Sequence, residues 1–186
     1  MFDIELFLRE KANPIYKAWY AVWVHWWPLW RKMHSGRKIQ QKWEQFNLVS
    51  EGQSFLDYGC GTGCFTLSAA KIVGMKGQVY ALDCFPQQLR IVQERARKAG
   101  LTNIETILSD NKTGLPDECI DIIWVCDVLH EIKQKRAILE ELHRVLKRDG
   151  ALAVYDGMKD RILGYTAGLF SLSGQDGKLL KFVKMG

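Results

Sequence analysis

Residues 55–63, FLDYGCGTG, combine an acid with three alternate glycines directly after an apolar run. The pattern predicts a buried strand that ends near Asp57, followed by a loop in which Gly59, Gly61 and Gly63 leave the backbone bare. Small residues in the next ten positions predict a helix packed closely on that strand. Such a loop exposes backbone N–H groups beside the positive end of a helix, which suits a ligand with an anionic group. A Cβ atom in the loop would hold that ligand away from the backbone.

Glycine spacing separates two classes of cofactor site. A dinucleotide site requires G-x-G-x-x-G, in which the third glycine lets the helix pack tightly on the strand. Counted from Gly59 the third position is Cys64, and counted from Gly61 it is Thr66. The loop has the form D-x-G-x-G-x-G instead, and it resembles the S-adenosylmethionine site of class I methyltransferases. For the loop taken alone, a tight turn in another α/β protein is the alternative.

Two further strands end in acids. The segment QVYALD at 78–83 predicts a strand ending in Asp83, whose carboxylate can accept hydrogen bonds from both hydroxyls of a ribose. After a predicted helix, NIETILSD at 103–110 predicts a third strand. The methyltransferase resemblance assigns the acid at its end, Asp110, to the adenine amino group. The alternative for Asp110 is a turn former or helix cap.

The fourth predicted strand, at 120–126, is apolar apart from one acid, which indicates a central strand buried on both faces. The sequence DVLHE follows it. An amphipathic helix is then predicted over 135–150, ended by its glycine, and a fifth strand over 151–156. The series LPDxxID, LHE and LxELxRVLKxxG resembles the second half of class I methyltransferase domains. The whole resemblance covers residues 48–156.

The 186 residues suffice for one domain with a full core, and alternating strands and helices predict a mostly parallel sheet. The resemblance implies a Rossmann-like α/β fold: a doubly wound, mostly parallel seven-stranded sheet in the order 3-2-1-4-5-7-6, with a C-terminal antiparallel hairpin, here over 169–185. We predict an aromatic-rich helical N-terminal extension or lid at 1–47 and an S-adenosylmethionine-binding methyltransferase domain at 48–186. No large insert precedes the hairpin, so acceptor choice would come from the extension and the short loops at the strand tips.

The extension holds five tryptophans and two tyrosines within residues 14–30. At helical spacing, one aromatic face would hold Tyr16, Trp19, Tyr20, Trp23 and Trp27. We predict that this face packs as a lid; the alternatives are a wall for an apolar or cationic substrate and a peripheral membrane anchor. Its apolar part, about thirteen residues, is too short to span a bilayer, which takes roughly twenty. The segment also lacks the pattern of a secretion signal.

Charge and cysteine content narrow the function classes. The net charge of +5 forms no long runs, and no stacking module or basic stripe accompanies it, which disfavours a nucleic-acid substrate. The five cysteines form no C-x-x-C pair and lack a histidine at zinc spacing. An odd number of cysteines without a secretion signal predicts reduced thiols and a cytoplasmic protein. We interpret them as buried small hydrophobes, with thiolate chemistry on an arsenite-type substrate as the alternative.

The resemblance implies S-adenosylmethionine as cofactor and methyl transfer to a small or apolar acceptor. The alternatives are an adenosyl-cofactor-binding protein without transfer activity and an NAD-dependent oxidoreductase. As catalytic candidates we name Asp127 and His130, because a histidine suits proton removal near neutral pH; a helix cap is the alternative for the DVLHE segment. No metal site is predicted. The predicted cofactor-binding residues are Asp57, Tyr58, Gly59, Cys60, Gly61, Gly63, Asp83, Cys84, Phe85, Asp110, Asn111 and Asp127.

Overall fold

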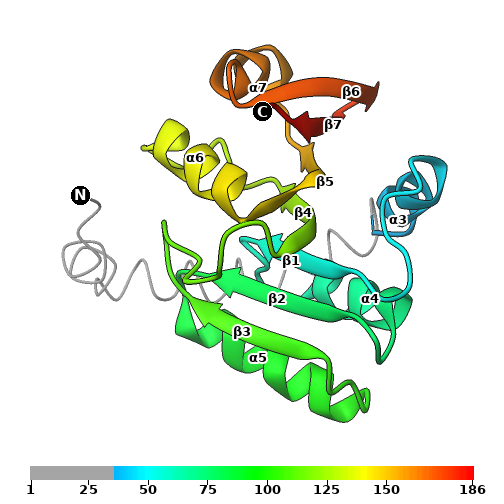
Figure 1. The fold of residues 1–186 in the computed structure, drawn as a ribbon. Helices are drawn as coiled ribbons and strands as arrows, with labels where there is room; N and C mark the ends of the chain where they lie inside the picture. Colours follow the sequence, from blue (N-terminus) through cyan, green and yellow to red (C-terminus); the bar gives the residue numbers. More distant parts are fainter. Residues whose placement is uncertain (1–35) are drawn as a thin grey trace. The chain divides into compact units, whose positions relative to one another are not determined.

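The computed structural model describes residues 36–186, and residues 40–186 form one compact unit (Figure 1). The predicted aromatic face at 14–30 lies outside the described residues. The division of the chain into an extension at 1–47 and a domain at 48–186 stays a prediction.

Seven strands form one sheet in the order β3-β2-β1-β4-β5-β7-β6 (Figure 1). The five strands from β3 to β5 in this order are parallel, whereas β7 is antiparallel to both β5 and β6. The predicted fold class, strand order and terminal hairpin are therefore confirmed. The strands are β1 (Ser54–Tyr58), β2 (Gln78–Asp83), β3 (Ile104–Leu108), β4 (Ile120–Cys126), β5 (Leu146–Tyr155), β6 (Phe170–Asp176) and β7 (Leu179–Lys184).

Helices cover the two faces of the sheet. Hydrophobic residues of α6 and α7 join one core cluster with alternate residues of the strands, such as Leu56 and Ile123. The side chains between them point to the other face, where α4 and α5 pack on β1, β2 and β3. Figure 1 shows α5 lying along β2 and β3, and α6 beside β4 and β5. The described helices are α3 (Gly36–Gln45), α4 (Cys64–Val73), α5 (Pro86–Lys98), α6 (Lys135–Val145) and α7 (Lys159–Thr166).

An aromatic cluster joins the end of α3 to the sheet. Trp43 is 2% exposed, and its ring centroid lies 5.2 Å from that of Trp124 and 5.5 Å from those of Phe55 and Phe65. Offset and edge-on aromatic pairs at this spacing add to the stabilisation that burial supplies. The last turn of α3 is therefore part of the core that supports β1 and β4.

The helix predicted over 135–150 is shorter in the structure. It ends at Val145, and β5 begins at Leu146 rather than at residue 151. Leu146 is fully buried and pairs with Ile120 of β4, so sheet pairing and burial outweigh the helical pattern. Gly150, expected to end the helix, instead makes room for this side chain: a Cβ atom there would lie 2.7 Å from Leu146 Cδ1.

Glu141 of α6 fixes the loop between β3 and β4. Its Oε1 atom accepts hydrogen bonds from the backbone N–H (2.9 Å) and hydroxyl (2.6 Å) of Thr113, and Arg144 donates to both carboxylate oxygens. Partial burial alone would raise the pKa of Glu141, but the hydrogen bonds from Arg144 and Thr113 outweigh it and lower that pKa to about 2. The ionised form is therefore the one that stabilises the fold.

We expect Glu141→Gln to lower the free energy of unfolding by about 2 kcal/mol at pH 7, because charge-assisted hydrogen bonds are lost. A depressed pKa stabilises the fold fully above the unfolded value near 4.5, and this stabilisation is lost as the pH falls towards 2. The difference from wild type should therefore shrink between pH 4.5 and 2 in urea unfolding. Glu140→Gln is the matched control, because Glu140 pairs only with Arg136 on the exposed helix surface and should cost about 0.5 kcal/mol or less. Equal losses in the two variants would contradict the prediction.

Candidate active site

Five parallel strands bring acidic side chains to one edge of the sheet. Each of these strands has an aspartate among its last two residues or is followed by one within two residues, at positions 57, 83, 110, 127 and 156. In open sheets of this type, ligands bind outside the carboxyl ends of the strands. The sequence predicted four of these acids as site residues, and the structure adds Asp156.

The glycine loop between β1 and α4 requires glycine for three different reasons. Gly59, Gly61 and Gly63 all have positive φ angles, of 73°, 52° and 80°. A Cβ atom at Gly59 would lie 2.4 Å from the side chain of Val128, and one at Gly63 would lie 2.9 Å from Leu67 on α4. Only at Gly61 would a Cβ atom enter open space. Gly59 and Gly63 thus make room for packing, and the expectation that a glycine makes room for a ligand stays a prediction for Gly61.

Asp83 holds the loop from the tip of β2. Its two carboxylate oxygens accept backbone hydrogen bonds from Gly61 and from Phe85, each at 2.9 Å. Burial raises the pKa of Asp83, and the hydrogen bonds from Phe85, Gly61 and Cys84 oppose that rise. Three donors leave one of the roughly four lone-pair sites of the carboxylate, which can accept a hydrogen bond from a ligand hydroxyl.

Asp57 and Tyr58 support the edge from β1. The buried Asp57 carboxylate accepts a hydrogen bond from the Thr66 hydroxyl at 2.5 Å, which ties the strand tip to α4. The Tyr58 hydroxyl donates to the backbone carbonyl of Asp110 at 2.8 Å, and burial raises the pKa of this phenol. Tyr58 therefore positions the loop that carries Asp110.

Asp110 carries a carboxylate oxygen that has no hydrogen-bond partner among the described residues. This oxygen, Oδ2, is buried, although the residue as a whole is partly exposed. A buried acceptor without a hydrogen-bond partner lowers the stability of the fold. Such an atom in a native protein therefore suggests that a bound ligand supplies the donor. The atom lies on the residue that the sequence predicted to bind an adenine amino group.

The segment after β4 is a tight turn rather than a helix start. Asp127 has a φ angle of +52°, uncommon for a residue other than glycine and typical of functional sites, and its N–H donates to the Tyr155 carbonyl. Leu129 is buried in the core beneath the turn, while His130 is exposed on it. Because α6 begins only at Lys135, His130 does not cap that helix, and the capping alternative is excluded.

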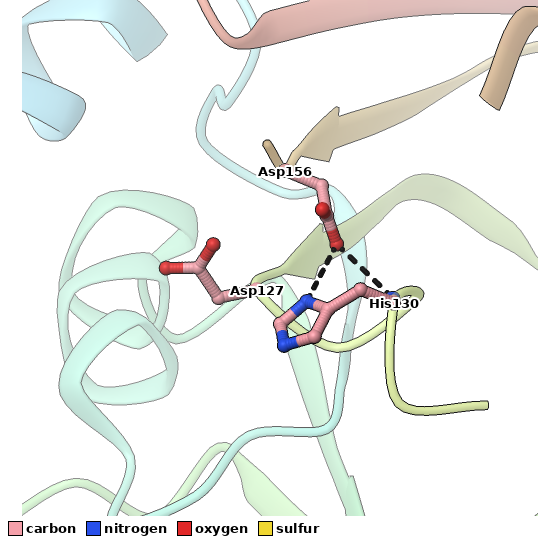
Figure 2. Close-up of side chains that lie close together, drawn as sticks. All are labelled: Asp127, His130 and Asp156. Carbon is pink, nitrogen blue, oxygen red and sulfur yellow. Dashed lines mark hydrogen bonds and ion pairs between the residues drawn. The ribbon is translucent and has the colours of Figure 1, made fainter. Parts of the chain in front are cut away.

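His130 lies against Asp156, the residue that follows β5. Its Nδ1 atom is 3.1 Å from Asp156 Oδ2, and its backbone N–H donates to the same oxygen at 3.3 Å (Figure 2). Asp127 lies beside the pair. One carboxylate oxygen of Asp127, one of Asp156 and a ring nitrogen of His130 all lie within 4.8 Å of one another. The Nε2 atom of His130 faces a more open region, where the nearest carboxylate is Glu131 at 3.8 Å.

The remaining predicted residues lie around the glycine loop and the tips of β2 and β3. Cys60 is buried, and this burial raises the pKa of its thiol, which disfavours thiolate chemistry at this position. Cys64 begins α4, Cys84 and Phe85 follow β2, and Asn111 is exposed after Asp110. All five cysteines are free thiols. The structure thus brings the predicted set to one edge of the sheet, while the role of each residue stays a prediction.

Comparison with known proteins assigns the family. The family described as "Methyltransferase domain" matches residues 49–167, which is more than half of the chain. The chain belongs to this family. This family match confirms the resemblance to class I methyltransferases. The match begins just before β1 and ends just after α7, so it includes every acidic strand tip.

Individual relatives of this methyltransferase domain agree with the assignment. A demethylmenaquinone methyltransferase of Listeria welshimeri is 29% identical over 133 residues, which are 69% of this chain and 56% of the relative. A solved S-adenosylmethionine-dependent methyltransferase from Aquifex aeolicus is 28% identical with a TM-score of 0.66, over 80% of this chain and 87% of that one. A coclaurine N-methyltransferase bound to N-methylheliamine and S-adenosylhomocysteine is 27% identical, with a TM-score of 0.57 over 64% of this chain and 35% of that one. The chain thus spans little more than half of the curated relative.

Sequence reasoning missed Asp156, although a signal for it was present. The predicted fifth strand ended with this acid, as the first and second strands end with Asp57 and Asp83. Because β4 and β5 are neighbours in the predicted strand order, residues directly after them must meet at one edge. That rule would have placed Asp156 beside the DVLHE segment of the methyltransferase domain.

Among the residues that the structure describes, no helix combines the length and the apolar character needed to cross a bilayer.

Proposed function

We propose that this domain binds S-adenosylmethionine and transfers its methyl group to a small or apolar acceptor. The observation that carries the proposal is the unpaired, buried Oδ2 atom of Asp110, at the same sheet edge as the open backbone of Gly61. An adenosyl ligand with an amino group at one end and an amino-acid group at the other matches these two features.

The residues present fit such a ligand in three places. Gly61 leaves open space for the amino-acid end, while its own N–H donates to Asp83. Asp83 keeps a lone-pair site for a ribose hydroxyl beside its three backbone donors. Asp110 offers an acceptor to the adenine amino group. In family members with this loop and these acids, the corresponding residues bind the same parts of the cofactor. This correspondence is the basis of the sequence prediction.

The cofactor supplies a methyl group already activated by its sulfonium. The protein's main contribution is therefore to hold the acceptor in line with that methyl group, and good positioning lowers a barrier by several kcal/mol, up to about 10. We assign proton removal to His130, because its Nε2 atom faces away from Asp156 into a more open region. A base of this kind contributes roughly a hundredfold or more when the acceptor must lose a proton. Asp127 lines the same region.

The acceptor class is part of the proposal. The Listeria relative is a demethylmenaquinone methyltransferase, which makes an apolar naphthoquinone-type ring the first acceptor to test. In its reduced form such a ring carries hydroxyl protons, and these suit a histidine base. We propose the cytoplasm as the place of action, with residues 14–30 as lid, acceptor wall or membrane contact; co-sedimentation with liposomes, with and without residues 1–38, separates the last alternative.

Two experiments test the function. Calorimetry with S-adenosylhomocysteine and NAD distinguishes a methyltransferase from an oxidoreductase, and only the first compound should bind. Transfer of labelled methyl groups to reduced demethylmenaquinone, and in parallel to a whole-cell extract, distinguishes an enzyme from a cofactor-binding protein. Binding of NAD alone, or cofactor binding without any transfer, would overturn the proposal.

We expect Asp110→Ala to weaken S-adenosylhomocysteine binding roughly tenfold, because one hydrogen bond of about 1.4 kcal/mol is lost. The free protein should be equally stable or more stable, because the variant removes an unpaired buried acceptor. Calorimetry and thermal unfolding measure the two effects. As a ligand control, wild type should prefer S-adenosylhomocysteine over its inosine analogue, which lacks the amino donor, and the variant should not. A variant that lost stability without losing this preference would show that Asp110 has a structural role only.

A further inference from the structure

We propose that Asp156 is a positioning residue that fixes the tautomer of His130, so that Nδ1 carries the proton and Nε2 is free to accept one from the acceptor. This inference rests on the proposed function, because it explains how His130, the base in the proposed reaction, is kept in the tautomer that can accept a proton. It names a residue that the sequence analysis did not include in the site.

Asp156 is built into the fold as a rigid acceptor. The residue is 1% exposed, and its own N–H donates to the Lys178 carbonyl at the start of β7. Its Oδ1 atom accepts the N–H of Met158 at 3.2 Å, which fixes the orientation of the carboxylate. The other oxygen, Oδ2, is left for His130 alone among the contacts of this side chain in the described part of the chain.

The carboxylate therefore dictates which imidazole nitrogen is protonated. Oδ2 has only lone pairs to offer, so the Nδ1 atom at 3.1 Å must be the donor. In a neutral imidazole the proton is then absent from Nε2, which becomes the acceptor. Two other carboxylates face the ring: Glu131, 3.8 Å from Nε2, and Asp127, within 4.8 Å in the same cluster. Neither accepts a hydrogen bond from a ring nitrogen, so Asp156 is the described carboxylate that sets the tautomer.

The pair lies beside the glycine loop. Val128, two residues before His130, occupies the space in which a Cβ atom of Gly59 would lie. The turn that carries the imidazole is therefore packed against the loop assigned to the cofactor. In the proposed step, Nε2 takes the acceptor's proton, the acceptor atom bonds to the methyl carbon, and the sulfur keeps the electron pair of the broken bond. The imidazolium then returns its proton to water.

Asp156→Leu makes a sharp test because it removes both acceptor oxygens at a similar side-chain volume. The imidazole then has no acceptor at Nδ1, and its proton is better placed on Nε2, which faces the more open region. Asp156→Asn is the matched control, because an amide oxygen turned towards His130 still accepts from Nδ1 and from the backbone N–H and gives up only the bond from Met158.

The first measurement is made without an acceptor. Long-range ¹H–¹⁵N NMR of the histidine-labelled protein, with the His130 signals assigned by His130→Gln, reports which ring nitrogen is protonated. We expect the proton on Nδ1 in wild type, in Glu131→Gln and in Asp156→Asn, and on Nε2 in Asp156→Leu. A wild-type His130 protonated on Nε2 would overturn the inference, whatever becomes of the proposed methyl transfer.

The second measurement is a double-mutant cycle on transfer to reduced demethylmenaquinone. We expect Asp156→Leu to lower kcat by roughly 10²–10⁴-fold, with S-adenosylhomocysteine affinity unchanged. In a His130→Ala background the same substitution should have no further effect on kcat, because a positioning residue acts through the group it positions. Equal losses in both backgrounds would show that Asp156 supports only the fold. Absence of transfer by wild type would refute the proposed function, and the NMR measurement would still decide the role of Asp156.

Discussion

Gly61→Val should abolish detectable binding of S-adenosylhomocysteine, with an affinity loss of about 100-fold or more. Valine at φ +52° strains the loop, because a β-branched residue rarely adopts left-handed backbone angles. Its methyl groups would also fill the open space above the backbone, where a ligand must approach. A 100-fold loss corresponds to about 2.7 kcal/mol. Calorimetry measures the affinity directly.

The control for this prediction is Gly52→Val. Gly52 also has a positive φ angle, of 82°, and open space around its Cβ position, but it lies before β1, at the opposite edge of the sheet. The backbone strain is thus reproduced away from the proposed site. We expect Gly52→Val to lose stability and to retain S-adenosylhomocysteine binding. If both variants lost affinity to the same extent, strain rather than ligand contact would explain the Gly61 result.

His130→Ala should lower kcat for labelled methyl transfer by roughly 10²–10⁴-fold. Its affinity for S-adenosylhomocysteine should stay within twofold of wild type, because the ring lies on the β4–α6 turn and contacts Asp156 rather than the glycine loop. A loss in kcat with unchanged cofactor binding marks a group that acts in the chemical step.

His143→Ala is the matched control for His130→Ala. The ring of His143 lies on α6, contacts the Phe170 ring and is 2.9 Å from the Met185 carbonyl, among residues of the terminal hairpin. Removing it should leave kcat unchanged. An active His130→Ala enzyme would mean that the acceptor needs no base, and His130 would then have no role in the reaction.

Much of the fold follows from local sequence patterns. The strand predicted at 120–126 is observed at the same residues, because a short apolar run rich in β-branched residues favours a strand covered on both faces. The acids at the ends of β1 and β2 were also placed correctly, because each directly follows an apolar strand pattern in the sequence. The strand order came from the family resemblance and not from these patterns.

Features that depend on contacts distant in sequence were not predictable in this way. The end of α6 is set by Leu146 entering the sheet beside Ile120, and no helical periodicity encodes that partner. Glycine is required at position 59 because the side chain of Val128 fills the space that a Cβ atom would need, and Val128 lies almost seventy residues later in the chain. Trp43 was assigned to an extension by composition, yet it packs against Trp124. In each case the deciding neighbour comes from another element.

The contact between Val128 and Gly59 has a consequence for inhibitor design. The valine methyl groups press on the bare backbone of the loop, so neither segment can shift without displacing the other. A compound that displaces the loop would also move the His130 imidazole away from Asp156, and would therefore affect both proposed roles, cofactor binding and proton removal. Resistance by substitution at residue 128 would then carry a penalty, because any larger side chain there collides with the same main chain.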